Sequence, residues 1–97
     1  MNCFTCKRIE MIKENKFPFF VKELETGYVV LGDHQYFNGY TLFVYKNHAT
    51  SLSDLTKEEQ MKYLSELLIV QDSVKSAFNC DGVDLELLAN SEHLVWQ

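Results

Sequence analysis

The last eight residues, NSEHLVWQ, place a single histidine in an alternating pattern that could do chemistry. If this stretch is a strand, its side chains point alternately to two faces. His93, Val95 and Gln97 then share one face, while Leu94 and Trp96 share the other. An imidazole can bind a metal or move a proton, but valine can do neither. The stretch is therefore either the remnant of an active site or the end of a small domain.

Three cysteines are the other reactive residues. Cys3 and Cys6 form a CxxC pair, and Cys80 stands alone, so the odd count does not suit a disulfide framework. The amino terminus is charged within ten residues and lacks the apolar stretch of a signal peptide. We therefore expect a cytoplasmic protein with reduced thiols. CxxC alone is compatible with ordinary thiols or with part of a zinc site, and no βαβ pattern surrounds it to favour a redox motif.

Length and charge limit the classes of function. The 97 residues predict one domain, 1–97, and the net charge is −5 with a pI near 5.0. A nucleic-acid-binding domain usually presents a basic face, so we expect no nucleic-acid partner. No apolar run approaches the length of a membrane span, and we expect no membrane partner.

The elements that must position these residues follow from hydrophobic spacing. We predict a helix over 4–14, two hairpin strands over 28–31 and 40–46, and further strands over 83–89 and from 93 onward. The long helix runs to about Phe78. Thr56 and Glu59 form its capping box, and its apolar residues recur at helical spacing: Met61, Leu64, Leu67, Leu68, Val74, Ala77 and Phe78. This order predicts an α+β fold with helices packed on an antiparallel sheet.

Three segments carry a resemblance to a known family. They are CFTC at the amino end, ELETGYVVLGDHQYFNGYTLFVYKNHATSLSDLTKEE in the middle, and ELLAN before the last strand. In this order they resemble the histidine triad (HIT) family of nucleotide hydrolases and transferases, in its bacterial CxxC-containing form. The resemblance covers nearly the whole chain. It implies a HIT-like antiparallel sheet with one long helix and a short amino-terminal helix, in a domain that is short at its carboxyl end.

The family signature is altered here. In HIT proteins, His-x-His-x-His lies on one strand, and the middle histidine attacks the α-phosphorus of a nucleotide. Aligned on its apolar residues, this strand matches the first histidine at His93, but it has Val95 at the middle position and Gln97 at the third. Valine cannot be a nucleophile. We therefore expect no catalytic residue of the covalent route, with His93 and Gln97 as remnants of the site.

The resemblance also implies a zinc site. In CxxC-bearing relatives, two cysteines, the histidine of a K-x-H turn and the first signature histidine hold zinc, which here corresponds to Cys3, Cys6, His48 and His93. Two thiolates and two imidazoles suit a closed tetrahedral structural site. The alternative is that the cysteines are ordinary thiols and His48 is a loop residue.

The family's nucleotide contacts match two positions. Asp33 corresponds to the ribose-binding acid and Asn90 to the phosphate-binding asparagine, although both could instead be ordinary turn residues. We interpret the aromatic residues as core and interface rather than as a base-stacking platform: Phe17, Phe19, Phe20, Tyr36, Phe37 and Tyr40.

Three functions are open from the sequence. The first is a catalytically impaired HIT-like protein, zinc-stabilised, that still binds a purine nucleotide. The second is an active HIT-type hydrolase or transferase seen as a truncated chain. The third is a non-catalytic, zinc-stapled interaction module. In each case the resemblance implies a homodimer.

Overall fold

The computed structural model describes residues 3–32, 39–87 and 93–97. Its elements are α1 (Phe4–Lys13), β1 (Phe20–Glu23), β2 (Gly27–Leu31), β3 (Thr41–Tyr45), the short 3-10 helix η1 (Leu52–Asp54), α2 (Lys57–Ala77) and β4 (Val95–Trp96). The strands form one antiparallel sheet in the order β1-β2-β3-β4. The predicted α+β fold, with one long helix and one short amino-terminal helix, is confirmed.

Both helices begin and end close to their predicted bounds. The capping box of α2 is present: Thr56 Oγ accepts from Glu59 N at 3.1 Å, and the Glu59 carboxylate accepts from Thr56 N at 2.8 Å. Past the end of α2, Asn79 adopts a left-handed backbone with φ of 49°, which stops the helix. Neither α1 nor α2 is long and apolar enough to cross a membrane.

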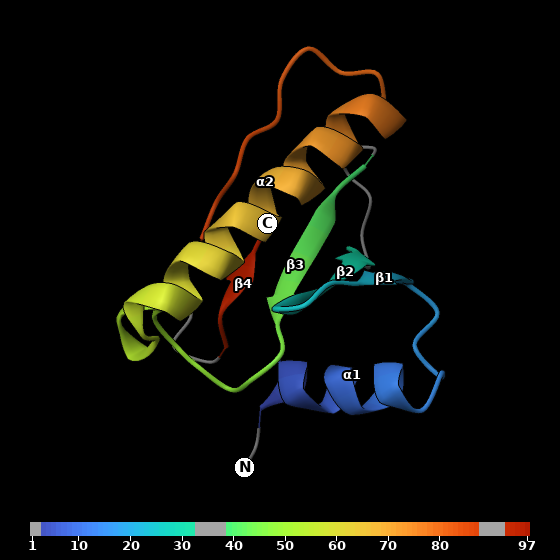
Figure 1. Cartoon of the computed structure of the whole chain (residues 1–97). Coiled ribbons are helices and arrows are strands. Elements are labelled where there is room, and N and C mark those ends of the chain that lie inside the picture. The colour runs from blue at the N-terminus through green and yellow to red at the C-terminus, as the bar shows by residue number, and fades with distance from the viewer. Residues whose placement is uncertain (1–2, 33–38, 88–92) are drawn as a thin grey trace.

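The two helices pack on opposite faces of the sheet, α2 on one and α1 on the other (Figure 1). All four residues of the edge strand β1 are exposed. Because side chains alternate along a strand, neighbouring residues of β3 enter different apolar layers. Phe43 and Tyr45 pack with α2, while Val44 packs with Ile9 and Ile12 of α1. The last strand follows the same rule, since Leu94 and Trp96 join the α2 layer and Val95 joins the α1 layer. The two faces predicted for the final strand are therefore confirmed.

The buried face of α2 differs from the one that leucine and methionine spacing suggests. Met61, Leu64 and Leu68 are exposed, and the buried residues of the helix are Tyr63, Leu67 and Val70, at spacings of four and three. Tyr63 is fully buried. Its ring packs between Phe43 and Tyr45, and its hydroxyl donates to the Phe43 carbonyl at 2.7 Å. Tyr63 thus lies at the centre of the interface between α2 and the sheet, and its hydroxyl is hydrogen-bonded to the backbone of β3.

The strand predicted over 83–89 is wrong for the part that the structure describes. Residues 83–87 form no strand and make only one bridge, Leu87 to Trp96, with reciprocal backbone bonds of 2.9 Å between Glu86 and Gln97. The physical reason is that β4 contains only two residues, so it offers almost no edge for a further ladder. The alternation itself persists, because Asp84 and Glu86 are exposed while Val83, Leu85 and Leu87 are partly buried.

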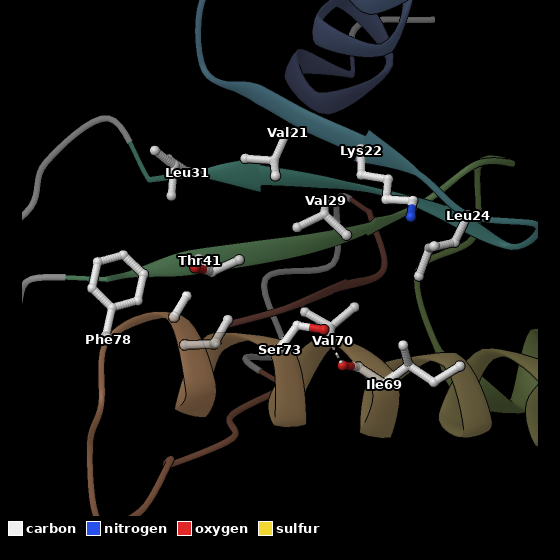
Figure 2. A pocket seen from close by; sticks show the side chains of 12 residues that line it. Val21, Lys22, Leu24, Val29, Leu31, Thr41, Ile69, Val70, Ser73 and Phe78 are labelled. Carbon is white, nitrogen blue, oxygen red and sulfur yellow. Dashed lines mark hydrogen bonds between the residues drawn. The ribbon is translucent and has the colours of Figure 1, made fainter.

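A groove of about 220 Å³ lies between the sheet and the carboxyl-terminal half of α2 (Figure 2). Its walls are apolar except for Lys22, Thr41 and Ser73. The two hydroxyls donate within the chain, Thr41 Oγ to the Gly39 carbonyl at 2.8 Å and Ser73 Oγ to the Ile69 carbonyl at 2.9 Å. This groove is on the α2 side of the sheet and so is separate from the face that carries Val95.

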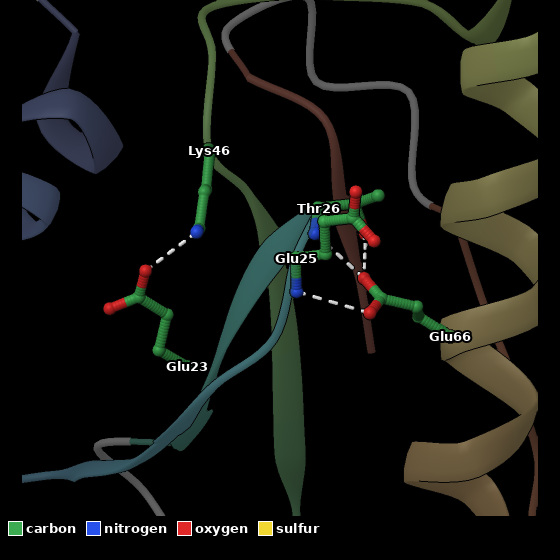
Figure 3. Close-up of polar contacts among 5 residues, drawn as sticks. All are labelled: Glu23, Glu25, Thr26, Lys46 and Glu66. Atoms are coloured by element: carbon green, nitrogen blue, oxygen red, sulfur yellow. Dashed lines mark hydrogen bonds and ion pairs between the residues drawn. The ribbon is translucent and has the colours of Figure 1, made fainter.

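Glu66 fastens α2 to the turn between β1 and β2 (Figure 3). Its carboxylate accepts from Glu25 N at 3.1 Å, from Thr26 N at 2.7 Å and from the Thr26 hydroxyl. Burial raises the pKa of the Glu66 carboxyl, but these hydrogen bonds outweigh burial and bring the pKa below its ordinary value of 4.5. The ionised carboxylate therefore favours the folded chain.

Replacing Glu66 with Gln should cost about 1 kcal/mol of unfolding free energy at pH 7, after allowance for solvent screening. Folding lowers the pKa of the Glu66 carboxyl. The stability that its carboxylate contributes is therefore complete above the pKa of the unfolded chain, and it is lost as the pH falls through the pKa of the folded chain. Urea unfolding of wild type and Glu66→Gln between pH 7 and pH 3 should show the difference shrinking towards acid. Asp72→Asn, an exposed change on the same helix, is the control. A cost that does not vary with pH would contradict this account.

Candidate metal centre and pocket

Four residues that are distant in the sequence converge at one end of the sheet. Cys3 and Cys6 come from the start of α1, His48 follows β3, and His93 precedes β4. One donor atom from each residue lies within 4.8 Å of the other three. The structure therefore brings together all four residues that the family resemblance suggested, close enough to share one metal ion.

The distances between sulfur and nitrogen match those around a tetrahedral ion. Cys3 Sγ lies 3.4 Å from His93 Nδ1, and Cys6 Sγ lies 3.4 Å from His48 Nδ1 and 3.6 Å from His93 Nδ1. With metal–sulfur and metal–nitrogen bonds of ~2.3 and ~2.0–2.1 Å, tetrahedral geometry separates a sulfur from a nitrogen by roughly 3.6 Å. The donor set and its spacing therefore both fit a four-coordinate metal.

His93 is held in the tautomer that a metal needs. The ring is 2% exposed, and its Nε2 lies 2.7 Å from the Tyr45 carbonyl oxygen. A carbonyl only accepts, so Nε2 carries the proton and the lone pair of the neutral ring is on Nδ1. Nδ1 is the atom that faces both sulfurs. In metal sites, a histidine ligand usually donates its other ring N–H to a carbonyl or carboxylate, which fixes the orientation of the ring.

The beginning of α1 places the two cysteines on one face. Cys3 is the residue that caps the helix, and its sulfur accepts from Cys6 N at 3.3 Å. Residues three apart lie side by side on a helix, so both thiols point to the same side. Burial, together with the Cys3 sulfur beside it, raises the pKa of the Cys6 thiol to about 11. A metal ion bound here would have to displace the proton from this thiol.

A pocket of about 200 Å³ lies between α1 and the sheet, on the face that carries Val95. Val95 forms part of its floor, next to Val44 of β3. Gln97 also lines the pocket, and its Oε1 accepts from the Tyr40 hydroxyl at 2.5 Å. The strand face that carries Val95 and Gln97 thus opens into a hollow large enough for part of a small ligand.

Sequence reasoning missed Arg8 and misjudged some of the aromatic residues. Arg8 lies with its guanidinium carbon 4.4 Å from the Phe4 ring centroid and 5.4 Å from that of Phe17. Phe17 lines this pocket, whereas Phe19 and Phe20 are exposed. Phe19 and Phe20 are therefore not core residues, and their role in an interface stays a prediction. The position of Arg8 in the sequence could have indicated that it lines the pocket. Arg8 directly precedes the buried Ile9, so it borders the face of α1 that meets the sheet.

The remaining predicted residues lie elsewhere. Asp33, Asn90, Tyr36 and Phe37 are outside the described residues. Cys80 is partly exposed beyond the end of α2, with its sulfur 3.9 Å from the Lys75 carbonyl oxygen, and it is not part of the metal cluster.

No family model matches the sequence, and no curated protein matches it. Solved structures do match. A HIT family member from Bacillus subtilis aligns with 99% of this chain and 70% of its own at a TM-score of 0.81 and 21% identity. A HIT family protein from Bacillus anthracis aligns with 98% of this chain and 70% of its own at 0.78 and 25%. A hypothetical histidine triad nucleotide-binding protein from Sulfolobus tokodaii aligns with 94% of this chain and 66% of its own at 0.76 and 21%.

These similarities show that the chain has the fold of the histidine triad proteins. The resemblance to the HIT family that the sequence suggested is confirmed. The chain spans 66% to 70% of the length of these three solved structures.

The cluster predicts that Cys6→Ser removes bound metal and Cys80→Ser does not, because only Cys6 is one of the four donors. Elemental mass spectrometry of purified protein should find one divalent metal ion per chain in wild type and in Cys80→Ser. When free metal is present at 1,000 times its Kd, binding adds about 4 kcal/mol to the unfolding free energy. Removing the metal should remove this contribution. For a domain of this size, that is roughly 15–30 °C in Tm. Equal metal content in both variants would contradict the site.

Proposed function

We propose that this chain is a HIT-type nucleotide-binding protein, stabilised by a structural zinc ion and lacking the covalent nucleotidyl-transfer step. The observation that carries the proposal is the position of Val95. This residue lies on the floor of a pocket between α1 and the sheet, two residues after a histidine of the candidate metal centre. The pocket supports binding, and the valine argues against the reaction.

Zinc is the metal that the donors favour. Two sulfurs and two imidazole nitrogens in a tetrahedral arrangement suit zinc, and four protein ligands leave no open position for a catalytic water. The ion would therefore act as a staple between α1, the turn after β3 and the last strand. Such a staple adds its binding free energy to folding, which matters most in a small domain.

A nucleotide fits the chemistry of the pocket. Its apolar walls, Ile9, Ile12, Phe17, Val30 and Leu42, can pack against a flat base. Base-stacking on an aromatic side chain does not depend strongly on sequence or base type. Gln97 supplies a polar group on the strand side. The nucleotide-binding description of the Sulfolobus relative agrees with this assignment. Asp33 and Asn90 are proposed as ribose and phosphate contacts on the resemblance alone.

The absence of catalysis is proposed from Val95. The family's route needs a nucleophile at the middle of the signature, and a valine side chain has no lone pair to attack phosphorus. Loss of the nucleophile costs on the order of 10⁶ in rate in subtilisin, a serine protease. The alternative of an active hydrolase would require a different nucleophile at this face.

The chain is further proposed to be a single domain and a homodimer in the cytoplasm. A second apolar face of α2 supports the dimer, because Met61 is 67% exposed and Leu68 and Ile69 are 55% and 56% exposed. Apolar side chains gathered on one helix face are typical of interaction surfaces. The same face favours the alternative of an interaction module, which differs from the main proposal in predicting no affinity for nucleotides.

Calorimetric titration with AMP and GMP tests binding. Both should release or absorb heat with the metal-loaded protein, and Phe17→Ala should weaken binding about tenfold because a base loses its stacking partner. Phe78→Ala is the matched control, since Phe78 lines the groove on the opposite face. If neither AMP nor GMP gives a heat of binding, the interaction module is favoured.

The proposed lack of catalysis has its own test. Incubation with a purine nucleoside phosphoramidate should release AMP no faster than buffer, because no nucleophile is available at Val95. Release of AMP that disappears when His93 or Gln97 is substituted would show that the strand still catalyses the reaction.

A further inference from the structure

We propose that the metal centre is also a redox switch, in which a hydroperoxide oxidises Cys3 and Cys6 to a disulfide, zinc leaves and the last strand loosens from the sheet. The inference rests on the proposed zinc site and adds its regulation. It follows from the unequal exposure of the four ligands, from the placement of both sulfurs at one end of α1, and from how little else holds the last strand.

The four ligands form an exposed pair and a buried pair. His48 is exposed and Cys6 is partly exposed, and the Cys6 sulfur lies 3.4 Å from His48 Nδ1. Cys3 and His93 are each only 2% exposed. A small oxidant in solvent therefore reaches the sulfur of Cys6 before that of Cys3. A cysteine that binds a metal does so as a thiolate, which is also the form that peroxides oxidise.

Cys3 is placed to complete the oxidation. The Cys6 N–H donates to the Cys3 sulfur at 3.3 Å, and the two sulfurs lie within 4.8 Å of each other. Cys3 caps the helix with an extended backbone, φ of −104° and ψ of 116°, so it is not held in the helical conformation. Small rotations at this residue would bring the sulfurs to the ~2.05 Å of a disulfide bond.

The reaction consumes one hydrogen peroxide for each zinc ion. The Cys6 thiolate attacks one oxygen, the O–O bond breaks, and the other oxygen leaves as hydroxide, which takes a proton to form water. The Cys3 thiolate then attacks the sulfur of the Cys6 sulfenic acid, and its oxygen leaves as a second hydroxide and is protonated. Each sulfur loses one electron, and the peroxide gains both. The products are a disulfide, two free imidazoles, Zn²⁺ and two waters.

Loss of zinc breaks the link between α1 and the last strand. Structural zinc sites use four protein ligands, and only two imidazoles would remain. The strand then keeps the bond from His93 to the Tyr45 carbonyl and the two residue pairs that β4 makes with β3. Leu94 and Val95 stay buried between the layers, so the strand loosens rather than leaves the sheet. Because Val95 and Gln97 line the pocket, oxidation would also disturb the proposed nucleotide site.

A permanent staple is the competing role for this centre. In that role the protein shields both sulfurs, and a thiol outside the cluster is oxidised first. Cys80 is such a thiol, since it is partly exposed and is not one of the four ligands. The proposed switch also differs from the catalytic dithiol of a βαβ redox protein, because these thiols act on the metal ion that they hold.

The test treats zinc-loaded wild type and Cys80→Ser with a few equivalents of hydrogen peroxide, after the metal content of both has been measured. Both should release one zinc ion per chain to a chromogenic chelator while losing two thiols, and neither should release zinc without peroxide. Peptide mass mapping should find a disulfide between Cys3 and Cys6, and dimedone, which traps sulfenic acids, should label Cys6 rather than Cys3. Hydrogen exchange of residues 94–96 should become faster, since it reports local opening. A dithiol reductant with added zinc should restore metal content and Tm.

Retention of zinc in wild type while Cys80 is oxidised would overturn the switch and leave the zinc site in place. Release of zinc with sulfinic acids and no disulfide would overturn it as well, because the change could not be reversed by a dithiol. Unchanged hydrogen exchange after zinc release would also overturn it, since the last strand would not depend on the ion. Purified protein that takes up no zinc before peroxide is added would overturn the proposed zinc site itself.

Discussion

The imidazole of His93 is the interaction on which the rest of this structure depends. One nitrogen donates to the Tyr45 carbonyl of β3, and the other faces the sulfurs of Cys3 and Cys6. A single buried ring therefore joins the last strand, the hairpin and the first helix. The strand that it precedes has only two residues in the sheet, so backbone pairing alone gives that strand little to hold it. Zinc bound at this cluster would supply the missing restraint.

The pocket lies on the side of the sheet that α1 covers. The helix that begins at the two cysteines packs over the face of the sheet that carries Val44 and Val95. Phe17 and Arg8 then close the remaining sides. In a HIT-type protein this face is where the reactive histidine would stand. Under the proposed function, the fold and the cavity are separable from the reaction, since a valine at this position would leave a site for binding without covalent chemistry.

Much of the fold and of the metal cluster could be predicted from the sequence, for identifiable reasons. The capping box of Thr56 and Glu59 and the β-rich run before Gly32 are local signals, and local signals were enough to predict the helices and the hairpin. The Cys and His donors were found by resemblance, because their convergence is a property of tertiary structure. Tyr63 was missed because a tyrosine can be either a core or a surface residue. Its burial against Phe43 and Tyr45, with its hydroxyl bonded to the Phe43 carbonyl, is a property of the tertiary structure. Arg8 was missed because a charge on an amphipathic helix is usually solvated. The strand over 83–89 failed because alternation shows an extended chain but does not show that a partner edge exists.

The most direct test of the central claim is X-ray absorption spectroscopy at the zinc edge on purified protein. The account predicts a four-coordinate shell of two sulfurs at ~2.3 Å and two imidazole nitrogens at ~2.0–2.1 Å. Substitution of His93 with Ala should remove one of the two nitrogen scatterers or release the metal. A shell without sulfur, or one that is unchanged by that substitution, would contradict the claim that this imidazole and the two thiols hold the ends of the chain together.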